Sequence, residues 1–238
     1  YSHCRDIISS THVALDELRQ YQNQPTGTLK VSSPISFGTA HLVPVIKELR
    51  SLYPHLKIEL LLEDRIINMV EEGVDLAIRI GWMQDSNLVA KKMCDSSMVV
   101  FASPEYLAKN TAPKKPEELV DHQWISLSLF NAPLRWTFNK NGKKNSKAHT
   151  VQVSSPIKSN SIDAVASLAL AGQGVSALAK YMVQAHFESG ALTQLLPNYD
   201  LKPVGIYAVY PHREHVPPKV RAFMDLLSRR CQQASWSE

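Results

Sequence analysis

The sequence lacks the features that define several large classes of protein. No apolar run approaches the roughly 18 to 20 residues that a membrane-spanning helix needs, so a membrane-spanning protein is excluded. The three cysteines, Cys4, Cys94 and Cys231, are odd in number and far apart, and no CxxC pair occurs. This usage is typical of a reducing compartment, not of a secreted disulfide framework, and it predicts a cytoplasmic protein.

An excess of charge of one sign is also lacking. The 26 Lys and Arg residues against 22 Asp and Glu residues give a net charge of +4, well short of the dense basic surface of a dedicated nucleic-acid binder. With 44% hydrophobic residues the chain can bury substantial cores, which excludes disorder and fibrous repeats. Its 238 residues fit two globular domains.

No motif of an enzyme active site is present. A GxSxG elbow, a P-loop and an HExxH pair are all absent. The tract Ala171–Gly174 lacks the third glycine of a dinucleotide fingerprint and follows a helix, so it predicts a helix stop. His212 and His215 lie in a proline-flanked loop without a third ligand. We therefore expect no enzyme activity, no cofactor and no metal site.

The start of the chain has neither an initiator methionine nor a signal peptide, which we interpret as the start of a fragment. The first segment, Tyr1–Gln22, spaces its apolar residues three and four apart. That narrow seam is typical of a coiled coil, with an ordinary amphipathic helix as the alternative. Pro25 and Gly27 then end the helix. The pattern predicts a pairing helix tethered to a globular body.

From Thr28 onward, short apolar runs alternate with helical periods. Strands are predicted at 29–32, 56–62 and 74–80, with helices at 42–52 and 66–72 between them. This order implies parallel pairing with right-handed crossovers.

A second unit of the same kind starts near Ser103, which is predicted to cap a helix that opens with Pro104. Asn141-Gly142 between two apolar runs predicts a hairpin. Further strands are predicted at 88–93, 98–102, 124–129, 134–138, 175–178 and 204–210, and further helices at 116–120, 162–170, 181–187 and 218–231. The chain thus reads as α/β, with two lobes of about 100 residues each.

Two polar turns follow strands and precede helices. In the first, Ser33 is a predicted helix cap and Pro34 occupies the first turn. The second, Lys158–Asp163, repeats this chemistry. Helix starts that face each other across a cleft present free backbone N–H groups, which suit a small carboxylate. The alternative is that both turns are ordinary helix caps.

Several tracts, taken together in order and spacing, resemble the effector-binding region of the LysR-type transcriptional regulators. The most specific is Glu72–Gly81, with the sequence EGVDLAIRIG. The others are Gly27–Gly38, Pro44–Pro54, Glu63–Arg65, Asp85–Ala90, Ala102–Leu107, Ala171–Val175 and Pro218–Phe223. The resemblance therefore covers nearly the whole chain.

This resemblance implies two Rossmann-like lobes with a central cleft, similar to type 2 periplasmic binding proteins. It implies a linker or dimerisation helix at 1–26, a first lobe of residues 27–101 plus 205–234, and a second lobe of residues 102–204. It also implies an N-terminal winged helix-turn-helix that is missing from this sequence.

By position, the resemblance also implies a set of effector-binding residues. They are Ser33, Pro34, Ser36 and Phe37 in the first-lobe turn, Glu63 and Trp82 at the cleft, and Asn160 and Ser161 in the second-lobe turn. Glu63 stands where some relatives carry a hydroxyl. An acid there repels an anionic effector unless Arg65 or Arg79 neutralises it.

The function implied is that of the effector-binding and oligomerisation domain of a bacterial DNA-binding regulator. A small-molecule effector shifts the arrangement of the lobes in a homodimer or homotetramer. This shift changes how the parent protein binds DNA through its missing domain. No membrane partner is expected. One alternative is a solute-binding protein of a transport system, against which the linker-like helix argues. The other is an enzyme on a two-lobe scaffold, for which no catalytic residue is found.

Overall fold

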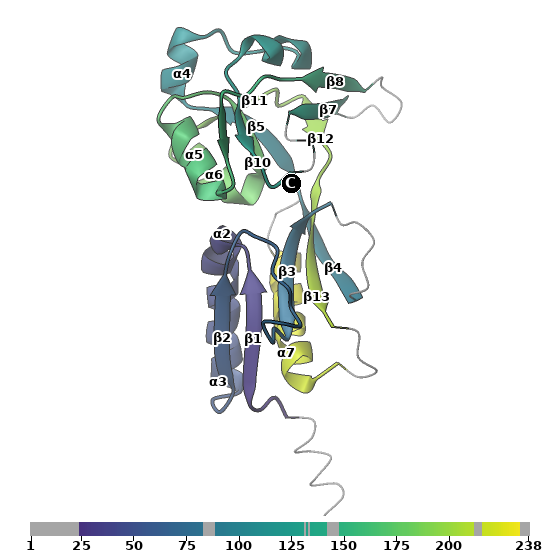
Figure 1. Ribbon diagram of the computed structural model, residues 1–238. Helices are drawn as coiled ribbons and strands as arrows, with labels where there is room; N and C mark the ends of the chain where they lie inside the picture. The colour runs from purple at the N-terminus through teal and green to yellow at the C-terminus, as the bar shows by residue number, and fades with distance from the viewer. Residues whose placement is uncertain are drawn as a thin grey trace, which may run out of the picture.

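The computed structural model describes residues 24–82, 89–130, 132, 134–141, 148–211 and 216–233. They form two α/β lobes, one above the other in Figure 1. The predicted helical seam at 1–22 and the pair His212 and His215 lie outside these residues. Within the described part of the chain, no helix has the length and apolar character needed to cross a bilayer.

The first lobe is built on a five-stranded sheet of order β2-β1-β3-β13-β4. Its strands are β1 (Thr28–Ser33), β2 (Lys57–Leu62), β3 (Leu76–Gly81), β4 (Val89–Ser96) and β13 (Val204–Tyr210). As predicted from the strand–helix–strand order, β1 pairs in parallel with β2 and β3. β13 runs antiparallel to β3 and β4, so a late part of the sequence lies near the middle of this sheet (Figure 1).

Helices cover one face of that sheet. α2 (Ile35–Phe37), the π-helical turn η1 (Gly38–Leu42) and α3 (Val43–Leu52) follow one another directly, and α7 (Pro218–Gln233) packs beside α3. The apolar stripe of α7 recurs at helical spacing and is buried in the first-lobe core, through Val220, Phe223, Met224, Leu227 and Cys231. The amphipathic helix predicted at 218–231 is therefore confirmed.

The second lobe contains three small sheets of order β10-β5-β11, β12-β7-β8 and β6-β9. Their strands are β5 (Met98–Ala102), β6 (Ile125–Leu127), β7 (Arg135–Lys140), β8 (His149–Gln152), β9 (Ile157–Ser159), β10 (Ser176–Ala179), β11 (Thr193–Leu195) and β12 (Tyr199–Leu201). The helices are α4 (Pro104–Lys109), the 3-10 helix η2 (Pro116–Asp121), α5 (Ile162–Leu170) and α6 (Lys180–Glu188). The antiparallel pairing of β7 with β8 confirms the predicted hairpin.

Along the described residues the chain crosses twice between the sheet of the first lobe and the sheets of the second lobe, and these two crossings are the first and second change of sheet. β4 ends at Ser96 and β5 begins at Met98, so the first change falls at Ser97. The second lies between the end of β12 at Leu201 and the start of β13 at Val204. Residues 98–101, which the sequence-based division gave to the first lobe, instead pair with β10 and β11 of the second.

The helix predicted at 66–72 is wrong, because this segment forms a turn. The Val70 N–H donates to the Asn68 side-chain oxygen at 3.2 Å, and the Glu72 N–H donates to the Asn68 carbonyl at 3.1 Å. Asparagine side chains compete in this way with helical hydrogen bonding. Apolar spacing alone does not reveal that competition.

Candidate functional site

The first-lobe turn runs from β1 into α2. Ser33 is not the helix cap that the sequence predicts: it is the last residue of β1, is 1% exposed, and donates its hydroxyl to the Pro34 carbonyl at 3.2 Å. The Ile35 N–H donates instead to Oδ1 of Asp64, at 3.1 Å. Because Asp64 follows β2, the cap comes from a neighbouring strand and not from the local sequence. A carboxylate of the chain itself therefore occupies this helix start.

Ser36 is the next polar residue of the turn. Its Oγ is buried and has no hydrogen-bond partner among the described residues. A buried hydroxyl left in that state costs about 1–3 kcal/mol. The π-helical turn η1 follows directly, and such turns are frequent at functional sites. A Cβ on Gly38 would lie 2.1 Å from Cδ2 of Leu62, so glycine is what lets the turn pack directly on β2.

Glu63 lies at the same edge of the sheet, where its N–H donates to the Ser33 carbonyl at 3.0 Å. The Glu63 carboxylate accepts a hydrogen bond from Nε of Arg65. That bond and the charge of Glu63 raise the pKa of the Arg65 guanidinium. Arg79 instead donates to the Ile67 carbonyl at 3.1 Å. Of the two arginines that the sequence offers for Glu63, Arg65 is therefore the one that binds it.

The second-lobe turn is a well-formed helix cap. Ser161 Oγ accepts the Ala164 N–H at 3.3 Å, and Ser159 Oγ accepts the Ser161 N–H at 3.1 Å. Asp163 adds a negative charge to the first turn of α5, where the helix dipole favours it. The cap predicted in this tract is confirmed. Asn160 is an exposed residue between the two serines.

Tyr181 of α6 contacts the first lobe. Its ring packs edge-on against Phe37 and His41, with ring centroids 5.6 Å and 5.2 Å apart. Phe37 and His41 also lie 5.0 Å from each other. α6 begins beside the first change of sheet, because the Lys180 N–H donates to the Ser97 carbonyl at 2.8 Å. These three rings therefore join the two lobes next to the first-lobe turn.

The charges of both turns reach Tyr181. Burial raises the pKa of its phenol well above the usual value, and Asp64, Cys94 and Asp163 raise it further. Asp64 follows β2 and caps the first-lobe turn through the Ile35 N–H, and Asp163 belongs to the second-lobe turn. The two turns are thus close enough for their carboxylates to act on one side chain. Sequence analysis missed Tyr181, since nothing in its local pattern distinguishes it from an ordinary helix residue.

Trp82 lies at the second change of sheet. Its Nε1–H donates to the Pro203 carbonyl at 2.9 Å, and its ring lies 5.3 Å from that of Phe130. The indole N–H is therefore bound by the protein itself.

The structure divides the eight sequence-predicted effector residues among three places. The first-lobe turn and the adjoining strand end hold Ser33, Pro34, Ser36, Phe37 and Glu63, the start of α5 holds Asn160 and Ser161, and the second change of sheet holds Trp82. In the described part of the chain, no group of three His, Cys, Asp or Glu side chains is arranged to hold a metal ion.

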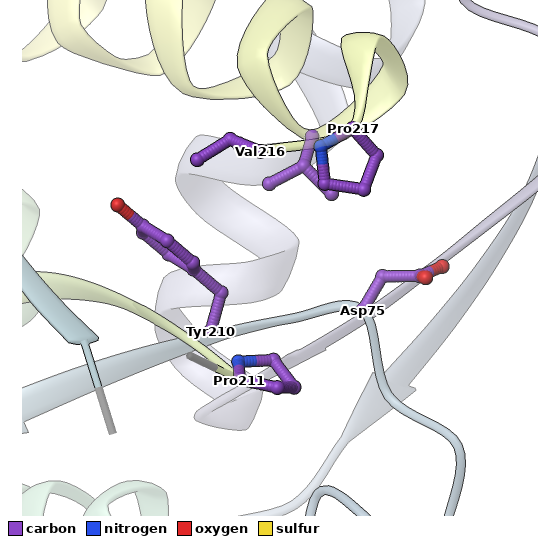
Figure 2. A pocket seen from close by; sticks show the side chains of 6 residues that line it. Asp75, Tyr210, Pro211, Val216 and Pro217 are labelled. Atoms are coloured by element: carbon purple, nitrogen blue, oxygen red, sulfur yellow. The ribbon is translucent and has the colours of Figure 1, made fainter. Parts of the chain in front are cut away.

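A small cavity lies away from these turns, beside the start of β3 and of α7 (Figure 2). It is lined by Asp75, Tyr210, Pro211, Val216, Pro217 and Val220 and has a volume of about 10 Å³. That volume holds about one water molecule. Asp75 is also engaged by Lys219, whose Nζ lies 2.6 Å from Oδ2. The cavity is too small for a metabolite.

Comparison with known proteins adds to this geometry. A family model described as the LysR substrate binding domain matches residues 22–232. The chain is 36% identical to the HTH-type transcriptional regulator PtxR of Pseudomonas aeruginosa over 214 residues. This match covers 90% of this chain and 67% of PtxR. It is 30% identical to the HTH-type transcriptional activator TtdR of Escherichia coli K12 over 234 residues. This second match covers 98% of this chain and 74% of TtdR.

Solved structures share the fold. The regulatory domain of CrgA, a LysR-type transcriptional regulator from Neisseria meningitidis, matches with a TM-score of 0.75 at 30% identity, covering 87% of this chain and 100% of that one. Full-length AphB of Vibrio cholerae matches with a TM-score of 0.73 at 24% identity, covering 97% of this chain and 77% of the AphB chain. The predicted α/β fold with two lobes, similar to periplasmic binding proteins, is confirmed.

Proposed function

Because the chain belongs to the LysR family of transcriptional regulators, we propose that it binds a small-molecule effector between the Ser33–Phe37 turn and the Asn160–Ser161 turn. The two-lobe body is the family's substrate-binding domain, so the predicted role as the effector-binding part of a regulator is confirmed. The relatives give no support to the transport alternative. Transcriptional regulators are not an enzyme class, and we propose that the site binds without catalysis.

The observation that carries this site is the position of Tyr181. It packs on Phe37 of the first-lobe turn, and the carboxylates of Asp64 and Asp163 both act on its phenol. Charges beside both turns therefore act on one residue of α6. A ligand held there touches both lobes, and its affinity depends on how the lobes are arranged.

Ser36 and Asn160 are the polar groups that support direct contact. The Ser36 hydroxyl is buried without a partner in the described residues, and Asn160 is exposed. A ligand that hydrogen-bonds Ser36 removes the cost of that unmade bond. Since Asp64 already binds the Ile35 N–H, an anionic effector binds without this donor or displaces the carboxylate. We propose that Ser36 Oγ and the Asn160 amide contact the effector.

The regulatory output follows from linkage. A ligand that binds one lobe arrangement more tightly shifts the population toward it. We propose that the linker segment at 1–26 pairs subunits into homodimers or homotetramers in the cytoplasm. The lobe arrangement is then transmitted to the DNA-binding domain of the parent protein.

A thermal-shift screen of the 238-residue chain against small metabolites tests the site. A ligand at 100 times its dissociation constant stabilises by about 2.7 kcal/mol, and a domain of this size gains about 2–4 °C per kcal/mol. For any hit, Ser36→Ala and Asn160→Ala should each weaken binding roughly fivefold, the value of about one hydrogen bond. Ser167→Ala, on an exposed part of α5, is the matched control. Unchanged affinity in both site variants would show that the effector binds elsewhere.

A further inference from the structure

Two thiols meet in the first lobe. Cys94 lies on β4 and Cys231 in the last turn of α7, and the two side chains are hydrogen-bonded to each other. Cys231 is 5% exposed in the first-lobe core, and Cys94 packs against that core while half-buried. Both are free thiols. The packing of α7 on β4 thus brings together two thiols that lie 137 positions apart in sequence.

A β-bulge turns Cys94 toward its partner. Cys94 pairs with Ile206 of β13, but Lys92 pairs with Tyr207, so Met93 is an extra residue in β4. Without it, strand alternation would place Lys92 and Cys94 on the same face. With it, Cys94 lies opposite Ile206, which belongs to the core that α7 covers. The pairing of the two thiols therefore depends on a specific irregularity of the strand.

We propose that Cys94 and Cys231 form a reversible disulfide when the protein meets hydrogen peroxide. The Cys231 thiolate attacks one peroxide oxygen, the O–O bond breaks, and the leaving hydroxide takes a proton to become water. The sulfur of Cys94 then attacks the Cys231 sulfenic acid, its proton leaves with the hydroxyl group as a second water, and the S–S bond forms. Two thiols lose two electrons in total, and one peroxide is reduced.

The electrostatics agree with these roles. The shared hydrogen bond raises the pKa of the Cys94 thiol and lowers that of Cys231. The thiolate is the reactive form of cysteine, so Cys231 is the attacking group and Cys94 the resolving one. Cys94 lies three residues before Ser97, where the chain first changes sheet. The bond would therefore tie α7 to the strand that leads into the second lobe.

Peptide mapping tests the proposal on the intact 238-residue chain. The reduced protein is treated with equimolar hydrogen peroxide, alkylated under denaturing conditions and digested with trypsin without reductant. Cleavage after Lys92 and Arg230 releases peptides 93–109 and 231–238, which should be recovered as one disulfide-linked species that dithiothreitol separates. Cys4→Ser is the matched control and should give the same linked species.

The variants separate the steps. In Cys94→Ser, Cys231 should accumulate as a sulfenic acid that dimedone traps, and the linked species should disappear. In Cys231→Ser, neither product should form. Recovery of peptides 93–109 and 231–238 as alkylated thiols or as sulfinic acids, or in links through Cys4 only, would overturn the proposal. The peptide map of the wild-type protein is enough to overturn the proposal, even if one of the variants fails to fold.

Discussion

Replacing Ser36 by alanine should stabilise the ligand-free protein while weakening its response to the effector. The Ser36 Oγ is buried and makes no hydrogen bond to the described residues. A buried hydroxyl without a partner costs about 1–3 kcal/mol, and alanine removes the polar atom that bears this cost. We expect a gain in unfolding free energy of about 1 kcal/mol, since the small cavity left by the oxygen offsets part of it.

Ser103→Ala is the matched control. Ser103 is a buried serine, 2% exposed, that precedes α4, and its Oγ accepts the Tyr106 N–H at 3.3 Å. Loss of such a cap costs typically about 1 kcal/mol. The two variants should therefore differ by about 2 kcal/mol, or about 4–8 °C in melting temperature for a domain of this size.

Urea titration followed by circular dichroism, with thermal unfolding beside it, measures both values. The slope of the free energy against urea should be the same in the two variants, because neither substitution changes the surface exposed on unfolding. If Ser36→Ala destabilises the protein as much as Ser103→Ala does, its hydroxyl is hydrogen-bonded in the ligand-free protein, and the argument for an effector contact at Ser36 is lost.

Two further predictions concern the frame around the site. Gly174→Ala should lower the unfolding free energy by about 3–5 kcal/mol in urea titration, because a Cβ there would lie 2.4 Å from the Gln123 carbonyl oxygen at φ +153°. Gly190→Ala, at φ +73° in open space, should cost only about 1–2 kcal/mol. Equal costs for the two variants would contradict the steric argument. Burial and then the charge of Arg230 lower the pKa of His41 from 6.5 to about 4, so the unfolded chain binds more protons between these values and stability should fall as pH drops through this window. His41→Phe should flatten that part of the pH profile of unfolding free energy, and a profile identical to wild type would refute the assignment.

The elements with strong local signals were predicted closely. Ser161 before an apolar helical period and Gly172 after it predicted a helix at 162–170, and α5 has these bounds. The strand predicted at 204–210 coincides with β13. In these segments capping, periodicity and side-chain size all favour the same structure.

The predictions that failed depend on partners distant in sequence. Ser33 carries the chemistry of a helix cap, but its pairing with Leu62 keeps it in β1, and Asp64 caps the helix instead. The short strands β9, β11 and β12 have three residues each, too few for an alternating pattern to be recognised. Propensity is a local quantity, and these contacts are not local.

The candidate site shows the same division. Residue types and their order indicated both turns, and the resemblance to LysR-type regulators supplied their role. The sequence did not indicate that Tyr181 would join the lobes, because its neighbours in space, Phe37 and His41, lie about 140 positions earlier in the chain. Nor did it reveal the bulge at Met93 that directs Cys94 to α7.

The position of β13 between β3 and β4 also sets the order in which the protein is completed during translation. Among the described strands, β4 has β13 as its single neighbour in the sheet, and every described element of the second lobe lies between the two in the sequence. At about 5–20 residues per second, β4 leaves the ribosome on the order of 10 s before its partner. During that interval the edge of β3 and the whole of β4 are unpaired, which exposes strand edges to other chains. The second lobe is synthesised in full before the first lobe can close, so nascent chains are most prone to misassociate over this interval.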